Sequence, residues 1–296
     1  MFAYLRSKYI VITHGLYNSK AGHPKKKLVI NVWHGMPIKN IGLLDSLTTN
    51  VLARCDVLIA TSALFRPLMA RAFNVDIQDV ILSGLPRNDI LTKRTCRTYD
   101  FLNTEKYMVW LPTYRKSDKL DVRLDGEVLE GVFGLSVAQL GVLNRVLAKM
   151  EVTLVVKPHP MDSSRPGKSD FSHISVIDER DILRNDSSLY EILGCSITLI
   201  TDVSSVLIDY ILTEKPVVLF FPDYERYSNS RGYAFDFDPY DYGDFFAATG
   251  DELIDRVSSI LEKQVVWPYH WDSFGYHDVR SGFTEKLLSE LSIKSD

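Results

Sequence analysis

Short apolar runs rich in β-branched residues alternate along the chain with longer stretches that have helical spacing. The runs predict strands at residues 9–13, 27–33, 57–60, 79–82, 108–111, 153–156, 174–177, 197–200 and 217–221. Helices are predicted between them, for example at residues 62–73, 136–150, 187–193 and 205–212. Because the runs are almost continuously apolar, we expect parallel strands buried on both faces, organised as βαβ units.

Polar stretches interrupt this alternation and suggest how the chain is divided. Residues 91–106 predict a linker between two α/β halves, whereas residues 116–131 and 161–170 predict surface loops. A length of 296 residues allows one large or two medium domains, and a hydrophobic content of 46% with 24% charged residues is ordinary for a folded protein.

Charge and cysteine content narrow the class of protein. The net charge of −4 argues against a general nucleic-acid binder. No apolar run approaches the length of a transmembrane helix, and residues 1–13 lack the pattern of a secretion signal. The cysteines Cys55, Cys96 and Cys195 lie far apart without metal-ligand spacing, so we expect reduced thiols in a cytosolic protein.

Polar motifs follow the predicted strands repeatedly. They are HGMPIK at residues 34–39, GLPRND at 84–89, PTYR at 112–115, KPHP at 157–160 and TDVSS at 201–205. Parallel sheets bind ligands at the carboxyl ends of their strands, so this repetition predicts a shared cleft between the two halves.

The TDVSS segment is a candidate anion site. Ser204 and Ser205 stand at the first turn of a predicted helix, where unpaired backbone N–H groups and the helix dipole favour negative charge. Alternatively, Ser204 is only a helix N-cap. Asp209 follows one turn later and is suited to accept hydrogen bonds from ribose or polyol hydroxyls, or else to pair with Lys215 or a neighbouring helix.

Histidine and basic side chains supply the other candidate chemistry. His34 precedes Gly35, which lets the backbone project the imidazole as a general base; the alternative is a structural histidine bonded to backbone. Lys157 and His159 flank Pro158 at a defined separation that suits a diphosphate, or they form a charged strand end without a ligand.

Arginines add planar donors for phosphate. Arg87 and Arg115 follow predicted strands, and Arg231 in an RGYAFDFD segment is a further candidate phosphate clamp. Either Arg87 or Arg115 alone is more often a surface or salt-bridge residue.

Taken together, the ordered motifs resemble the CDP-glycerol glycerophosphotransferase family, which includes teichoic acid primases and polymerases and related capsule enzymes. The resemblance covers roughly residues 4–261. It implies an α/β fold of two facing Rossmann-like halves, similar to glycosyltransferase B, with a shortened N-terminal half. Residues 1–98 would form the acceptor side and residues 99–296 the CDP-alditol side, with the last helix packing back on the N-terminal half.

The resemblance also implies roles for single residues. His34 resembles the general base of the family, and His159 and Arg231 would stabilise the diphosphate and the leaving group. The implied donor-binding residues are Arg87, Thr113, Arg115, Lys157, Asp202, Ser204, Ser205 and Asp209.

The implied function is transfer of glycerol-phosphate or ribitol-phosphate from a CDP-linked donor to a hydroxyl of a teichoic-acid-like or capsule polymer, with release of CMP. No cofactor or metal is expected, and the acceptor would be lipid-linked or a polysaccharide, at the inner face of the cell membrane. Two alternatives stay open: a nucleotide-sugar-dependent glycosyltransferase of the same fold, or a donor-binding module without turnover.

Overall fold

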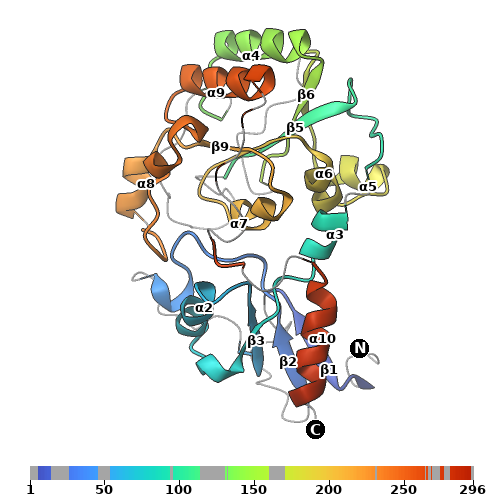
Figure 1. Cartoon of the computed structure of the whole chain (residues 1–296), viewed down its shortest axis with the longest axis vertical. Coiled ribbons are helices and arrows are strands. Elements are labelled where there is room, and N and C mark those ends of the chain that lie inside the picture. Colours follow the sequence, from blue (N-terminus) through green and yellow to red (C-terminus); the bar gives the residue numbers. More distant parts are fainter. Residues whose placement is uncertain are drawn as a thin grey trace.

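The chain forms two halves, each built on its own parallel sheet (Figure 1). The computed structural model describes residues 6–14, 27–45, 54–93, 96–113, 131, 133–159, 171–230, 232–263, 265, 268, 274–276 and 281–294. The two sheets confirm the predicted α/β class and its two facing halves. The division at residue 98 and the acceptor and donor sides stay predictions.

The N-terminal sheet contains four strands in the described part of the chain. Their spatial order is β1 (Tyr9–Ile12), β2 (Leu28–Asn31), β3 (Val57–Ala60) and β4 (Val80–Leu82), and all neighbours are parallel. β3 is buried at every position, as its unbroken apolar run predicts. The helix α2 (Phe65–Phe73) packs on this sheet, and the 3₁₀ helices η2 (Gly42–Leu44) and η3 (Ile77–Asp79) lie nearby.

The C-terminal sheet contains six parallel strands among the described residues. Their order is β10 (Phe246–Ala247), β9 (Val217–Phe220), β8 (Leu199–Thr201), β5 (Lys106–Leu111), β6 (Val152–Val156) and β7 (Ile174–Val176). The strand order reverses between β5 and β8, because the chain continues from β5 to one side of the sheet and returns at β8 to the other. Such a switch point opens a crevice outside the carboxyl ends of the two strands.

Helices cover this second sheet. They are α4 (Val137–Lys149), α5 (Glu179–Arg184), α6 (Leu189–Cys195), α7 (Val206–Tyr210), α8 (Tyr224–Ser230) and α9 (Gly250–Lys263), with the 3₁₀ helices η4 (Ile211–Thr213) and η5 (Pro239–Phe245). α4 starts where predicted because Ser136 and Gln139 form a capping box. The predicted helix 205–212 is shorter than expected, since α7 ends at Tyr210 and continues as a 3₁₀ turn.

The last helix of the chain returns to the N-terminal half. α10 (Phe283–Lys294) contacts β4 and α3 (Asn88–Lys93). Figure 1 shows this helix below the C-terminal half, beside the N-terminal sheet. The carboxylate of Asp89 accepts hydrogen bonds from the backbone N–H groups of Phe283 and Thr284, at 2.8 and 2.9 Å, and so caps α10. Phe283 lies against Gly84, where a Cβ would come within 2.2 Å of the ring. The GLPRND segment therefore anchors the chain terminus as well as facing the other half.

The expectation of reduced thiols is wrong for Cys96 and Cys195, which form a disulfide with Cα atoms 5.5 Å apart. Cys96 follows α3 and Cys195 ends α6, so the bond ties the segment between the sheets to the C-terminal half. The partners are 99 residues apart, and no local pattern reveals such a pairing. Cys55 is free, and burial raises the pKa of its thiol to about 12.

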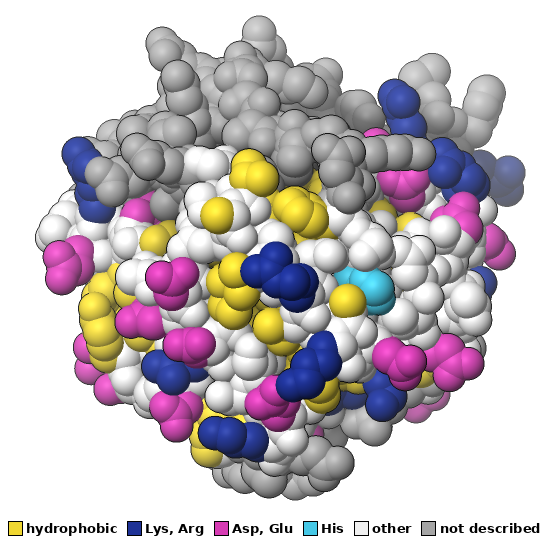
Figure 2. Space-filling view, turned by 90° about the horizontal axis from the view of Figure 1, so that it is seen from above, with side chains coloured by type: hydrophobic (Ala, Val, Ile, Leu, Met, Phe, Trp, Pro, Cys, Tyr) yellow, Lys and Arg dark blue, Asp and Glu magenta, His cyan; other side chains and the backbone are white. Residues whose placement is uncertain are grey.

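Figure 2 views the molecule from the end that carries α4 and α9 in Figure 1. Lys, Arg, Asp and Glu side chains are interspersed on the described part of this face, with small hydrophobic areas between them. The two helices are joined by polar contacts such as Lys149 to Glu262, at 3.2 Å. In the part of the chain that the structure describes, no helix is long and apolar enough to cross a membrane.

Breaking the disulfide should lower the free energy of unfolding. A cross-link closing a loop of this length restricts the unfolded chain, an effect typically worth about 2–4 kcal/mol. We expect Cys96→Ser to unfold at a lower temperature than the oxidised wild type in a thermal scan. Reductant should lower the melting temperature of Cys55→Ser as it does that of the wild type, but should not lower that of Cys96→Ser. Equal melting temperatures for all three proteins, with and without reductant, would contradict the assignment.

Candidate functional site

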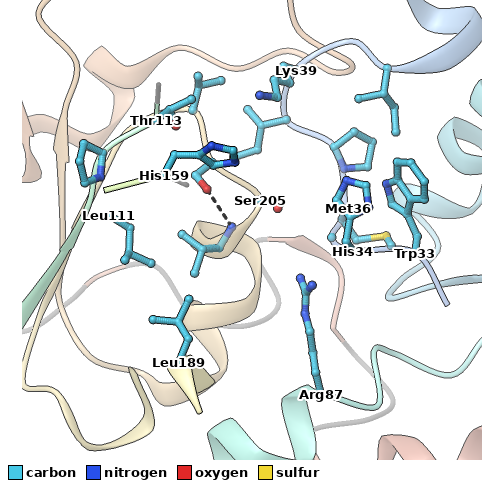
Figure 3. Close-up of a pocket in the computed structure, with 18 of the residues that line it drawn as sticks. Trp33, His34, Met36, Lys39, Arg87, Leu111, Thr113, His159, Leu189 and Ser205 are labelled. Carbon is cyan, nitrogen blue, oxygen red and sulfur yellow. Dashed lines mark hydrogen bonds between the residues drawn. The ribbon is translucent and has the colours of Figure 1, made fainter. Parts of the chain in front are cut away.

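A cavity of about 640 Å³ lies where the two halves face each other. The N-terminal half lines it with residues 33–39, 41, 42, 45 and 87, and the C-terminal half with residues 111–113, 157–159, 189, 190 and 203–206. Most of the C-terminal contributions lie at the ends of β5, β6 and β8, so the cavity opens at the switch point of that sheet, and residues 189 and 190 come from the start of α6. In the close-up of Figure 3, His34 lies on one side of the cavity and His159 and Thr113 lie on the other.

The structure brings most of the predicted site residues to this cavity. Those that line it are His34, Arg87, Thr113, Lys157, His159, Ser204 and Ser205. Asp202 and Asp209 are buried and are not among the lining residues. Arg115 and Arg231 lie outside the described residues.

Local backbone conformation presents His34 to the cavity. Trp33 has a positive φ of 45°, an uncommon conformation for a side chain of this size, and Gly35 has a φ of 140°. Nδ1 of His34 lies 3.1 Å from the carbonyl oxygen of Thr13. Because a carbonyl oxygen only accepts, Nδ1 carries the proton and Nε2 keeps its lone pair. The ring also stacks on His14, with centroids 4.4 Å apart.

The pKa of His34 is lowered to about 4. Partial burial of the ring is the largest cause, and the hydrogen bond to Thr13 partly opposes it. Proximity to His14, Arg87 and Lys39 lowers the pKa further. His34 is therefore neutral near pH 7 and able to accept a proton.

The two serines occupy different positions at the start of α7. The Ser204 hydroxyl accepts a hydrogen bond from the backbone N–H of Val206 at 3.4 Å, drawn as the dashed line in Figure 3. Ser205 makes no side-chain cap. Gly35 of the opposite half approaches Ser205 so closely that a Cβ on it would lie 2.3 Å from Oγ. The serine turn is thus part of the contact between the halves.

A buried carboxylate holds Thr113 at the cavity wall. Asp202 is 5% exposed and accepts hydrogen bonds from the Thr113 hydroxyl and, at 3.2 Å, from its backbone N–H. This contact joins the ends of β5 and β8 across the switch point. We expected Asp202 to line the cavity itself. It lies behind the wall and holds Thr113, which does line the cavity.

Basic side chains approach the cavity from both halves. Lys157 lies 3.3 Å from Glu179, and its side chain is only 10% exposed. Sequence reasoning did not select Lys39, although it ends the same segment as His34. Lys39 forms an antiparallel bridge with Tyr233, and the N–H of Ala234 donates to the Ile38 carbonyl at 2.8 Å. This backbone pairing is a second contact between the halves.

Arg87 and Asp209 face each other across the halves. The Arg87 guanidinium donates to the Asp209 carboxylate, which also accepts from Asn88 at 3.1 Å and from the Tyr190 hydroxyl at 2.6 Å. Asp209 is 0% exposed and does not line the cavity, whereas the expected contact with a ribose or polyol would need a carboxylate at the cavity surface. The alternative, in which Asp209 pairs with a basic residue or a neighbouring helix, agrees better with this position, but the partner is Arg87 and not Lys215. α7 is too short and too deeply packed to carry both Ser205 and Asp209 on a solvent-facing side.

The fold and the cavity define a class of protein: a glycosyltransferase-B-like molecule with basic, hydroxyl and imidazole groups between two parallel-sheet halves. Residues 1–271 match the CDP-glycerol:poly(glycerophosphate) glycerophosphotransferase family, and the chain belongs to this family. The predicted family is therefore confirmed.

Curated relatives agree with this membership. The teichoic acid poly(ribitol-phosphate) polymerase of Bacillus spizizenii is 27% identical over 79% of this chain and 36% of its own length. The teichoic acid poly(glycerol phosphate) polymerase of Bacillus subtilis is 26% identical over 100% of this chain and 41% of its own. The Staphylococcus aureus ribitol-phosphate polymerase TarK is 25% identical over 89% of this chain and 52% of its own. The chain spans about a third to a half of the length of these relatives.

Solved structures match the fold. The wall teichoic acid polymerase TagF, in a variant soaked with CDPG, superposes with a TM-score of 0.73 at 21% identity, covering 99% of this chain and 74% of that one. A putative UDP-N-acetylglucosamine 2-epimerase from Listeria monocytogenes gives 0.53 at 13% identity, over 99% of this chain and 76% of that one. These likenesses confirm the predicted fold.

Gly35→Ala should disturb the contact between the halves. The added Cβ would overlap Ser205, and overpacking of this kind costs about 1–3 kcal/mol in addition to backbone strain. Gly243→Ala is the matched control: its φ is also positive, at 50°, but no atom lies within 4 Å of the new Cβ. Chemical denaturation should show a larger fall in the free energy of unfolding for Gly35→Ala than for Gly243→Ala. Adding Ser205→Gly to Gly35→Ala should restore part of this free energy. Equal losses, or no restoration, would contradict the close approach.

Proposed function

We propose that this protein transfers a glycerol-phosphate or ribitol-phosphate unit from a CDP-linked donor to a hydroxyl of a teichoic-acid-like polymer, with release of CMP. The observation that carries the proposal is the meeting of a neutral histidine with basic and hydroxyl side chains from both halves around one cavity. Membership of the family and the names of the relatives support the substrate class. A lipid-linked acceptor at the inner face of the membrane remains part of the proposal.

In the proposed reaction His34 acts as the general base. Nε2 takes the proton of the acceptor hydroxyl, and the oxygen attacks the β-phosphorus of the donor. The bond from that phosphorus to the bridging oxygen breaks, and CMP leaves with the electron pair. Placement of the nucleophile and stabilisation of phosphate charge supply most of the rate enhancement in phosphoryl transfer.

The basic side chains would stabilise the diphosphate. Lys39 and Arg87 reach the cavity from the N-terminal half, and Lys157 and His159 reach it from the C-terminal half. The hydroxyls of Thr113, Ser204 and Ser205 offer hydrogen bonds to the same oxygens. Arg115 and Arg231 are proposed as further donor contacts from the family resemblance.

His34→Ala should abolish most CMP release from CDP-glycerol or CDP-ribitol in the presence of a polymer acceptor. General-base catalysis contributes typically 10²–10⁴-fold, so we expect a loss in kcat of this order. His173→Ala is the matched control, because His173 is half-buried and is not among the residues that line the cavity. Full activity of His34→Ala would exclude the assigned role. Donor binding without CMP release by the wild type would identify a donor-binding module instead.

The activity should persist to unusually low pH for a histidine base. Above pH 4 the ring is neutral and competent, and it is protonated only as the pH falls through about 4. The acidic limb of kcat/KM should therefore lie near pH 4 and not near 6.5. The unfolded chain binds this proton more readily, so His34 should reduce stability as pH falls from about 6.5 towards 4. An acidic limb of kcat/KM at pH 6.5 would contradict the first point. A free energy of unfolding that falls between pH 6.5 and 4 no more steeply in the wild type than in His34→Ala would contradict the second.

A further inference from the structure

Arg87 belongs to the N-terminal half, but the C-terminal half holds its side chain. The residue follows β4, and its guanidinium donates to Asp209 of α7. The guanidinium also lies over the ring of Tyr190, 4.9 Å from its centroid, on helix α6. Its charge is therefore placed at the cavity by groups that meet it only when the halves are together.

Tyr190 contacts both members of this ion pair. Its ring stacks under the guanidinium, and its hydroxyl donates to the Asp209 carboxylate at 2.6 Å. Burial is the largest cause that raises the pKa of the hydroxyl, and the Asp209 charge raises it further, so Tyr190 stays protonated and donates. Burial would lower the pKa of Arg87, but the Asp209 carboxylate outweighs this effect and the guanidinium stays charged.

We propose that Tyr190 is a positioning residue which, together with Asp209, orients the Arg87 guanidinium at the cavity when the two halves are closed. A fully buried carboxylate requires several donors, and Tyr190 supplies one of the three that Asp209 receives from the described part of the chain. Without the hydroxyl, the Asp209–Arg87 contact loses a fixed geometry and the guanidinium gains freedom to leave the cavity wall. The inference rests on the proposed function only in naming the anion that Arg87 meets, the diphosphate of a CDP-alditol.

The test compares Tyr190→Phe with Tyr107→Phe. Each change removes one hydroxyl that donates a hydrogen bond: that of Tyr190 to Asp209 at 2.6 Å, and that of Tyr107 to the Ile192 carbonyl of α6 at 2.8 Å. Tyr107 is not among the residues that line the cavity, and its hydroxyl bonds to Ile192 and not to Arg87 or Asp209. A purely structural role for Tyr190 would make the two variants behave alike.

Two readouts separate positioning from stability. Calorimetric titration with CDP-glycerol should show Kd raised about tenfold to a hundredfold in Tyr190→Phe and unchanged within about twofold in Tyr107→Phe, as expected for loss of one hydrogen bond to a charged group. The rate of modification of Arg87 by phenylglyoxal, measured by peptide mass spectrometry, should rise in Tyr190→Phe alone. Arg87 labelling equal to wild type in Tyr190→Phe, or equal effects in both variants, would overturn the proposal.

The positioning role of Tyr190 can be tested even if the proposed function is wrong. If the wild type neither binds CDP-glycerol nor releases CMP, the substrate assignment is wrong. The phenylglyoxal experiment needs no substrate, so faster labelling of Arg87 in Tyr190→Phe than in Tyr107→Phe would still support the positioning role. Equal labelling would still reject it.

Discussion

The buried carboxylate of Asp209 is the constraint on which the arrangement of the two halves depends. A fully desolvated charge is strongly unfavourable unless opposite charge and hydrogen-bond donors surround it. Arg87 and Asn88 come from the segment after β4, whereas Tyr190 comes from α6. Separation of the halves would remove the Arg87 and Asn88 donors together. Of the described donors to Asp209, only Tyr190 would then remain, so the buried charge stabilises the closed arrangement.

Other contacts around the cavity reinforce this arrangement. The approach of Gly35 to Ser205 and the backbone pairing of Lys39 with Tyr233 join the halves on the side of the long segment after β2. On the other side α3 and α6 pack so closely that a Cβ on Gly194 would lie 2.6 Å from the Leu91 carbonyl oxygen. The disulfide fastens the same region. The cavity is therefore enclosed by several independent contacts at the switch point of the larger sheet.

Apolar runs predict the strands well because a parallel strand covered on both faces is almost continuously apolar, as β3 and β9 are. The two-residue strand β10 carries too few positions to form such a pattern. The strand-end motifs also locate the cavity, since parallel strands bring their carboxyl ends together. Long-range pairings are a different matter. Cys96 with Cys195, and Arg87 with Asp209, join residues about a hundred positions apart, and the packing of α3 on α6 and η4 brings them together. Helical spacing placed Asp209 beside Ser205, but spacing does not say which face is buried.

Net charge is similarly uninformative about the site. The chain carries −4 overall, yet Lys39, Arg87 and Lys157 approach a single cavity. Their positive charge affects both the binding of an anion and the protonation of His34. It favours binding of an anionic donor, and it disfavours a proton on His34, whose pKa is lowered mainly by burial and further by Arg87 and Lys39. A bound diphosphate would offset part of that positive charge and so raise the proton affinity of His34 when the acceptor hydroxyl must be deprotonated. In the proposed reaction, the charges that would attract the donor would also help burial to keep the free base neutral, and the donor itself would strengthen that base.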